Sequence, residues 1–195
     1  MTTTDFFTNT KEIIVTLSAL VGIFIAYKGL EKWKQELVGK TNFDTAKSLL
    51  KATYKTRKAI HTLRRNWILR EEYNYMEDLS EVEKFKEVFS KRLQVLDDAS
   101  QELEAMIVEG QALWGKEFEK TFSALNVVID KLRLSIDQYI VLLEEPNTDK
   151  ESVEFLELKA TIFHVAILDQ AHESFAHNLY LAIKHIEDEI RKRLK

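Results

Sequence analysis

The chain has 195 residues, of which 31% are charged, 5 are Gly, 1 is Pro and none is Cys. So few turn-forming residues argue against an all-β fold and against a glycine-rich nucleotide loop, and the composition predicts an all-α protein. The absence of Cys excludes disulfides, thiolate metal sites and a cysteine nucleophile. Charge is unevenly distributed, because Lys28–Arg70 carry a net charge of +9 and the residues from Glu71 onward a net charge of −12.

The first predicted element is a membrane helix. Ile13–Tyr27 (IIVTLSALVGIFIAY) contains no charged residue. Fifteen helical residues reach about 22 Å, short of the ~30 Å hydrocarbon core, but Lys11 and Lys28 can snorkel and the bilayer can thin locally. The run predicts one transmembrane anchor; a buried soluble helix and a cleaved signal peptide are the alternatives.

The flanks of this run predict its orientation. Lys28, Lys32, Lys34 and Lys40 follow the run, whereas only Lys11 precedes it. The positive-inside rule therefore places the amino terminus outside and the rest of the chain in the cytoplasm.

Small residues mark one side of the predicted anchor. Ser18, Gly22 and Ala26 are spaced four apart. Such a stripe lets two membrane helices approach closely, which predicts association of the span with itself or with another span. Small residues are also common in membrane helices, so the spacing of these three can arise by chance.

A break is predicted at Gly39–Asn42, with Thr41 or Asn42 as the N-cap of a helix from Phe43 to Arg70. We accordingly divide the chain into residues 1–40, with the anchor and a basic segment, and residues 41–195, a helical bundle. Cations of the predicted helix fall within an arc of about 80° at 100° per residue. This basic stripe consists of Lys40, Lys47, Lys51, Lys55, Lys58 and Arg65. Three interpretations remain open. The stripe is a solvated face that can dock on the acidic helices, or it binds anionic lipid headgroups. Binding of nucleic acid has the least support.

Three more helices are predicted, each with apolar residues at spacings of three and four. The first begins at the capping box Ser80–Glu83 and ends near Gly110 or Gly115. The second follows a heptad seam from Phe118 to Leu143. The last opens at a capping box, Thr148–Glu151, and runs to the carboxyl terminus. Short connections between long helices favour antiparallel neighbours, which predicts an elongated antiparallel four-helix bundle, coiled-coil-like in its seams.

Two polar residues interrupt the seam of the last helix. Asp169 and His172 are three apart, a spacing at which a carboxylate and an imidazole form an ion pair or supply two metal ligands. A di-iron bundle needs two such motifs and two further carboxylates, and the chain offers no second Glu-x-x-His or Asp-x-x-His. A polar break in the seam is the simpler reading, and the pair is a weak metal candidate. We expect no cofactor.

The sequence that follows the apolar run resembles a group of bacterial proteins. The sequence from Gly29 to Lys40, followed by Phe43, Tyr54 and the Arg65-Asn66-Trp67 triplet, is similar to small bacterial proteins with one amino-terminal membrane helix and a cytoplasmic helical region, a group without an assigned activity. The resemblance implies a single-pass protein of the bacterial inner (cell) membrane. It brings no catalytic residues.

Together these features predict a membrane-anchored cytoplasmic module that is not an enzyme and acts by protein association. The expected partners are the lipid bilayer, a second copy or another protein, and anionic lipid headgroups. Two alternatives remain: a bundle enzyme or metal or ligand sensor centred on Asp169 and His172, and an effector that perturbs the membrane.

Overall fold

A computed structural model describes residues 3–65, 78–146, 148–163 and 169–194. Within these ranges the secondary structure is helical and contains no strand, which confirms the all-α prediction. The chain divides into two units, Met1–Asp44 and Thr45–Lys195. The division thus falls after Asp44, whereas the sequence placed it after Lys40.

Helix α1 runs through both units without interruption, from Thr3 to Leu63. The predicted break at Gly39–Asn42 is therefore wrong. Thr41 does not cap a new helix, because its Oγ1 donates to the carbonyl oxygen of Leu37 at 3.0 Å and stays within the ladder. A single Gly costs a helix only about 1 kcal/mol, too little to end it. The helix also stops earlier than predicted, at Leu63 rather than Arg70, although residues 66–70 lie outside the described residues.

Helix α3 spans Glu81–Trp114 and confirms the predicted capping box. The backbone N–H of Glu83 donates to Ser80 Oγ at 3.3 Å, and the N–H of Ser80 donates to Glu83 Oε2 at 2.8 Å. Hydrogen bonds from Ser80 also lower the pKa of the Glu83 carboxyl group. The helix ends at Gly115, whose φ of 89° suits glycine, while Gly110 lies inside it.

The heptad seam that starts at Phe118 is not one α-helix. Its first residues form the 3₁₀ helix η1, Lys116–Phe122, and helix α4 begins only at Ser123 and continues to Glu144. Phe118 and Phe122 are both fully buried in this tight turn. Their rings meet edge to face at 5.5 Å, and Phe118 meets Trp114 in the same way at 4.7 Å. Aromatic packing at this corner therefore replaces the first turns of the predicted helix.

The predicted capping box at Thr148–Glu151 is wrong. Thr148 Oγ1 donates to the carbonyl oxygen of Leu142 and so satisfies the end of α4. The next helix, α5, spans Val153–Ile162, and its N-cap is Ser152, whose side chain accepts from the N–H of Phe155.

The last predicted helix is also interrupted. Helix α5 ends at Phe163, which has an extended backbone with φ −109° and ψ 146°, and α6 spans Asp169–Arg193. The extended backbone inserts the Phe163 ring among three other rings, with centroids at 6.1 Å from Phe85, 5.8 Å from Phe89 and 6.0 Å from Tyr139. Ring packing in this aromatic cluster stabilises the extended backbone at Phe163.

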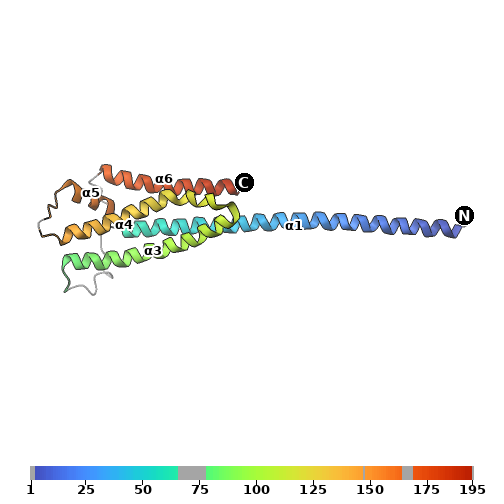
Figure 1. The fold of residues 1–195 in the computed structure, drawn as a ribbon, viewed down its shortest axis with the longest axis horizontal. Coiled ribbons are helices and arrows are strands. Elements are labelled where there is room, and N and C mark those ends of the chain that lie inside the picture. The colour runs from blue at the N-terminus through green and yellow to red at the C-terminus, as the bar shows by residue number, and fades with distance from the viewer. Residues whose placement is uncertain (1–2, 66–77, 147, 164–168, 195) are drawn as a thin grey trace. The chain divides into compact units, whose positions relative to one another are not determined.

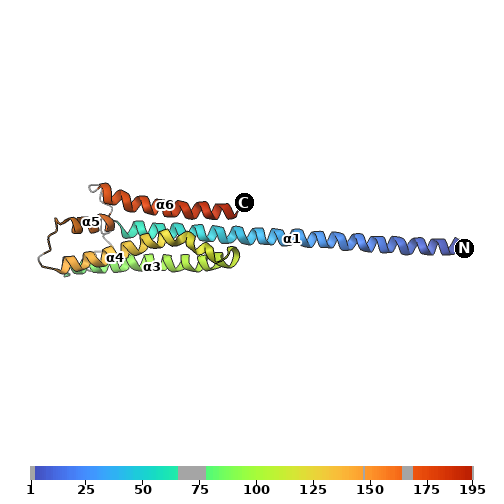
Figure 2. The same ribbon diagram turned by 45° about the horizontal axis from the view of Figure 1, so that its top comes forward.

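The second unit is a helical bundle whose long helices lie side by side (Figures 1 and 2). Residue pairs give their directions. Lys55 of α1 pairs with Glu102 of α3, and nearer the end of α1 the backbone carbonyl of Leu63 accepts from Arg92. Residue numbers rise along α1 where they fall along α3, so the two helices are antiparallel. The α3–α4 pairs Asp97–Arg133 and Lys86–Glu144 follow the same antiparallel rule.

Helix α6 closes this arrangement against α1. Tyr54 Oη donates to Glu187 Oε1 at 2.9 Å, whereas the Arg64 guanidinium lies 4.2 Å from the centroid of the Phe175 ring. These two helices are thus antiparallel as well.

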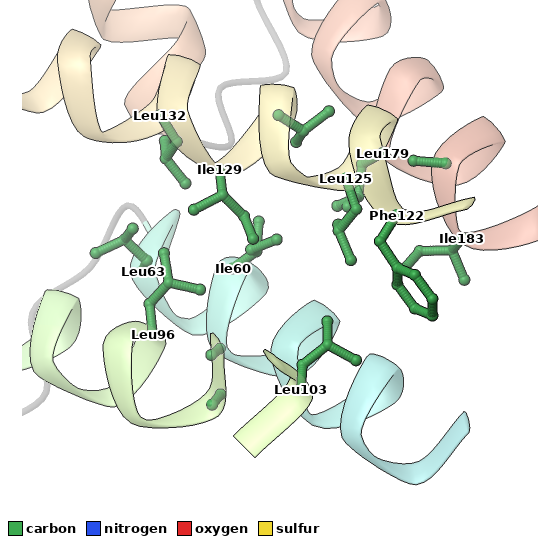
Figure 3. Close-up of a cluster of buried hydrophobic side chains, with 14 of the residues drawn as sticks. Ile60, Leu63, Leu96, Leu103, Phe122, Leu125, Ile129, Leu132, Leu179 and Ile183 are labelled. Carbon is green, nitrogen blue, oxygen red and sulfur yellow. The ribbon is translucent and has the colours of Figure 1, made fainter. Parts of the chain in front are cut away.

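The core is drawn from every helix of this unit (Figure 3). Ile60 and Leu63 of α1 face Leu96 and Leu103 of α3, with α4 and α6 residues completing the cluster. Its fully buried members include Leu49, Ile60, Leu63, Leu96, Leu125 and Leu132.

Gly110 marks the closest approach in the bundle. A Cβ atom there would lie 2.5 Å from Phe118 Cε1 and 3.2 Å from Leu49 Cδ1. Because Phe118 and Leu49 are fully buried, neither side chain can move aside into solvent. Only glycine fits at this position.

We predict that Gly110→Ala lowers the free energy of unfolding by about 1–3 kcal/mol, because overpacking outweighs the gain in helix propensity. Thermal unfolding followed by circular dichroism measures the change. The control is Gly39→Ala, whose added Cβ would have no atom within 4 Å. A melting temperature for Gly110→Ala at or above that of the unsubstituted chain would contradict the packing described here.

Candidate interaction surfaces

The first unit exposes apolar side chains on all sides of α1. From Leu17 to Val38 each described large apolar side chain is about half exposed or more, as with Ile23 at 67% and Trp33 at 60%. At 100° per residue they surround the helix rather than forming one stripe. They are Leu17, Leu20, Val21, Ile23, Phe24, Ile25, Tyr27, Leu30, Trp33, Leu37 and Val38. An apolar surface of this extent is typical of a segment that another molecule or a lipid phase covers.

The search for a membrane span returns no candidate. Among the residues that the structure describes, no helix is both long and apolar enough to cross a bilayer. The side chains of residues 13–16 and 19, which belong to the predicted anchor, lie outside the described residues. The transmembrane helix therefore stays a prediction from the sequence.

The predicted small-residue stripe has open surroundings in the single chain. Ser18, Gly22 and Ala26 are all exposed, and a Cβ atom at Gly22 would meet no atom within 4 Å.

The lysines of the basic stripe lie on the outer side of α1, from Lys40 in the first unit to Lys58 in the second, and Arg65 follows the end of the helix. Lys40, Lys47, Lys51, Lys55 and Lys58 are exposed, whereas Arg65 is half-buried. On the helical wheel the stripe is opposite the residues that α1 buries, such as Leu49 and Leu63. Lys55 forms an ion pair with Glu102, and Arg65 Nη2 donates to Thr62 Oγ1 at 3.3 Å.

Asp169 and His172 both belong to the first turns of α6, but their side chains lie outside the described residues. The part of the chain that the structure describes holds no group of three or more His, Cys, Asp or Glu side chains that could bind a metal. Whether the pair forms a site is therefore not tested.

Two buried arginines were missed by the sequence analysis. Arg64 and Arg92 are each only 3% exposed. Arg64 Nε donates to the carbonyl oxygen of Thr161 at 2.8 Å, and Nη2 donates to that of Ala160 at 3.1 Å, so this side chain caps the end of α5. Burial lowers the pKa of the Arg64 guanidinium to about 10, which keeps it charged at neutral pH.

Arg92 binds the end of α1 in a similar manner. Its Nη1 donates to the carbonyl oxygens of Arg65 at 2.8 Å and Leu63 at 3.4 Å. Both arginines thus tie the end of one helix to a side chain of another. The signal was present in the sequence, because each Arg lies three or four residues from buried apolar positions, Ile60 for Arg64, and Phe89 and Leu96 for Arg92.

Comparison with known proteins gives no relative. No family model matches the chain, and neither the curated proteins nor the solved structures include a match. The resemblance to small bacterial membrane proteins therefore stays a prediction, and function must be argued from the surfaces described above.

We predict that Arg64→Ala lowers the free energy of unfolding by about 2–4 kcal/mol, because hydrogen bonds to a charged group contribute about 1.5–3 kcal/mol and two buried carbonyls lose their donor. Urea denaturation measures the loss. Arg57→Ala is the matched control, since Arg57 is exposed on the same helix and its removal should change stability by less than about 0.5 kcal/mol. Equal effects of the two substitutions would contradict a capping role for Arg64.

Proposed function

We propose that the chain is a membrane-anchored helical module that acts by protein association. The observation that carries this proposal is the exposed apolar surface around α1 from Leu17 to Val38, which continues the uncharged run that begins at Ile13. Apolar area costs about 25 cal/mol per Å² when it stays in water, and lipid removes that cost on every side of a helix at once.

Residues at the end of the run support an anchor in lipid. Tyr27 and Trp33 are aromatic residues of the kind enriched at membrane interfaces, and both are exposed. Lys28 and Lys32 follow closely, and their long side chains can reach the headgroups from a short helix. The excess of Lys after the run supports a cytoplasmic bundle and an outside amino terminus, in the inner (cell) membrane of a bacterium.

The basic stripe supports a second contact with the bilayer. Lys40, Lys47, Lys51 and Lys58 point away from the buried side of α1. A cytoplasmic leaflet rich in anionic lipids attracts each such cation by about 1 kcal/mol within a Debye length. The stripe would bind headgroups where it lies near the membrane surface.

Association follows from the same helix. Ser18, Gly22 and Ala26 offer a smooth side for a second copy or for another span, and a Cβ atom at Gly22 would meet no described atom within 4 Å. The bundle then becomes the part of the protein that is concentrated at the membrane and presented to a cytoplasmic partner.

We predict that Ile23→Lys combined with Phe24→Lys releases the chain from membranes, because only Ile13–Gly22 would then remain uncharged, too short a run to span the hydrocarbon core. The measurement is the fraction of protein that floats with liposomes or resists carbonate extraction. The control is Val95→Lys combined with Val108→Lys, two exposed positions on α3. Release of the unsubstituted chain by carbonate, or retention of the Ile23/Phe24 variant, would contradict the proposal.

The absence of native Cys allows a direct test of orientation. We predict that Ser123→Cys, an exposed position at the start of α4, reacts with a membrane-impermeant maleimide only after the cells are lysed. Labelling is read as a mass shift on a denaturing gel. Equal labelling in intact and lysed cells would place the bundle outside and overturn the proposed topology.

A further inference from the structure

A groove between α4 and α6 lies outside all the surfaces described so far. Its volume is about 430 Å³, within the range of small-molecule sites. Val127, Val128 and Leu181 form its walls, and Phe175 lies at its base, 1% exposed. Two small residues, Ala124 and Ala182, leave the space between the helices unfilled.

Polar side chains are few and carry no negative charge. Lys131, Asn178 and His185 are the polar residues of the lining, and no Asp or Glu belongs to it. An ammonium, an amide and an imidazole offer hydrogen-bond donors to an anion. Lys131 is exposed, so its ammonium group can meet a ligand at the rim while the walls stay apolar.

The dimensions of the groove limit what it can hold. The lining covers residues 124–131 of α4 and 175–185 of α6, about 10 and 15 Å of helix at 1.5 Å per residue. A standard protein–protein interface buries about 800 Å² on each partner, more than such a groove can offer. A single flexible chain with one charged end matches both the length and the chemistry.

Apolar area remains available to such a ligand. Val127 is 67% exposed and Leu181 is 48% exposed, although both belong to well-packed helices of the bundle. Covering them would remove apolar surface from water without displacing any core side chain.

We propose that the α4–α6 groove binds a free single-chain anionic amphiphile of the fatty-acid class, with the acyl chain between Val127 and Leu181 and the carboxylate at Lys131. Binding in this groove needs no bilayer, so it stands apart from the proposed membrane anchor.

The experiment uses the full purified chain kept dispersed by an amphipol, which requires no insertion in a bilayer, and a photoactivatable diazirine analogue of laurate as the probe. After irradiation, peptide mass spectrometry locates the adducts. We expect adducts on residues 124–131 and 175–185 that unlabelled laurate suppresses. Adducts confined to other helices, including residues 17–38 of α1, would overturn the proposal.

Two matched variants test whether the labelling depends on the lining of the groove. Val127→Glu places a carboxylate in the groove and should reduce adducts there at least tenfold, whereas Leu134→Glu, also exposed on α4 but outside the lining, should leave them within twofold. Both substitutions are at exposed positions, and thermal unfolding checks that each variant is folded. Equal labelling of the two variants would overturn the proposal.

The charge of the ligand is tested separately. The methyl ester of the same probe keeps the acyl chain and loses the anion, so it should label the groove at least fivefold less, and Lys131→Met should remove this difference. Equal labelling by acid and ester would overturn the assignment of an anionic ligand. A crosslink between Lys131 residues of two copies that laurate does not compete away would show a second copy in the groove and would also overturn it.

Discussion

Water penalises the apolar surface of a helix by about 25 cal/mol per Å², and this cost governs how each part of the chain is built. From Thr45 onward, α1 has one apolar side, and α3, α4 and α6 cover it with their own buried faces. From Leu17 to Val38 the apolar residues surround the helix, and the side chains are exposed. One continuous helix therefore carries a buried seam in the bundle and, in the first unit, a surface that the chain itself leaves open.

Within the bundle, the need to satisfy helix ends explains the buried charges. The last carbonyls of a helix have no partner in their own ladder, and burial would leave them without water. Arg64 serves the end of α5 and Arg92 the end of α1, each through a guanidinium that presents several donors at once. Phe163 belongs to the same region, because its extended backbone ends α5 where Arg64 donates and its ring enters the aromatic cluster. Arg64, Arg92 and the extended backbone at Phe163 thus all act at helix ends within the bundle.

Two outer surfaces of the bundle differ from each other in chemical character. The basic stripe on α1 is charged and exposed, suited to a negatively charged surface, whereas the groove between α4 and α6 is mostly apolar with three polar side chains. The first depends on long-range attraction that salt weakens, and the second on shape and on contact with few donors. The proposed headgroup contact of the basic stripe and the proposed ligand site therefore rest on different physics and can be tested separately.

The sequence by itself determined which segments are helical and which sides are apolar, because both follow from local spacing and composition. The Ser80–Glu83 capping box and the apolar seam of α3 are examples, since a cap and a period of three and four residues need no distant partner. The exposed positions of the basic stripe also agree with its place on the helical wheel. The side chains of Asp169 and His172 lie outside the described residues, and no described helix is long and apolar enough to cross a bilayer.

Only the tertiary structure decided where helices break and which polar residues are buried. The sequence suggested a break at Gly39–Asn42, yet α1 continues there, because a single Gly costs a helix too little to end it. It suggested continuity at Phe118 and at Phe163, yet the chain leaves the α-helix at both, because aromatic side chains fill space supplied by other helices. The contacts of Arg64 and Arg92 were decided in the same way. Their partners are carbonyl groups distant in the sequence, and such contacts exist only once the helices have packed.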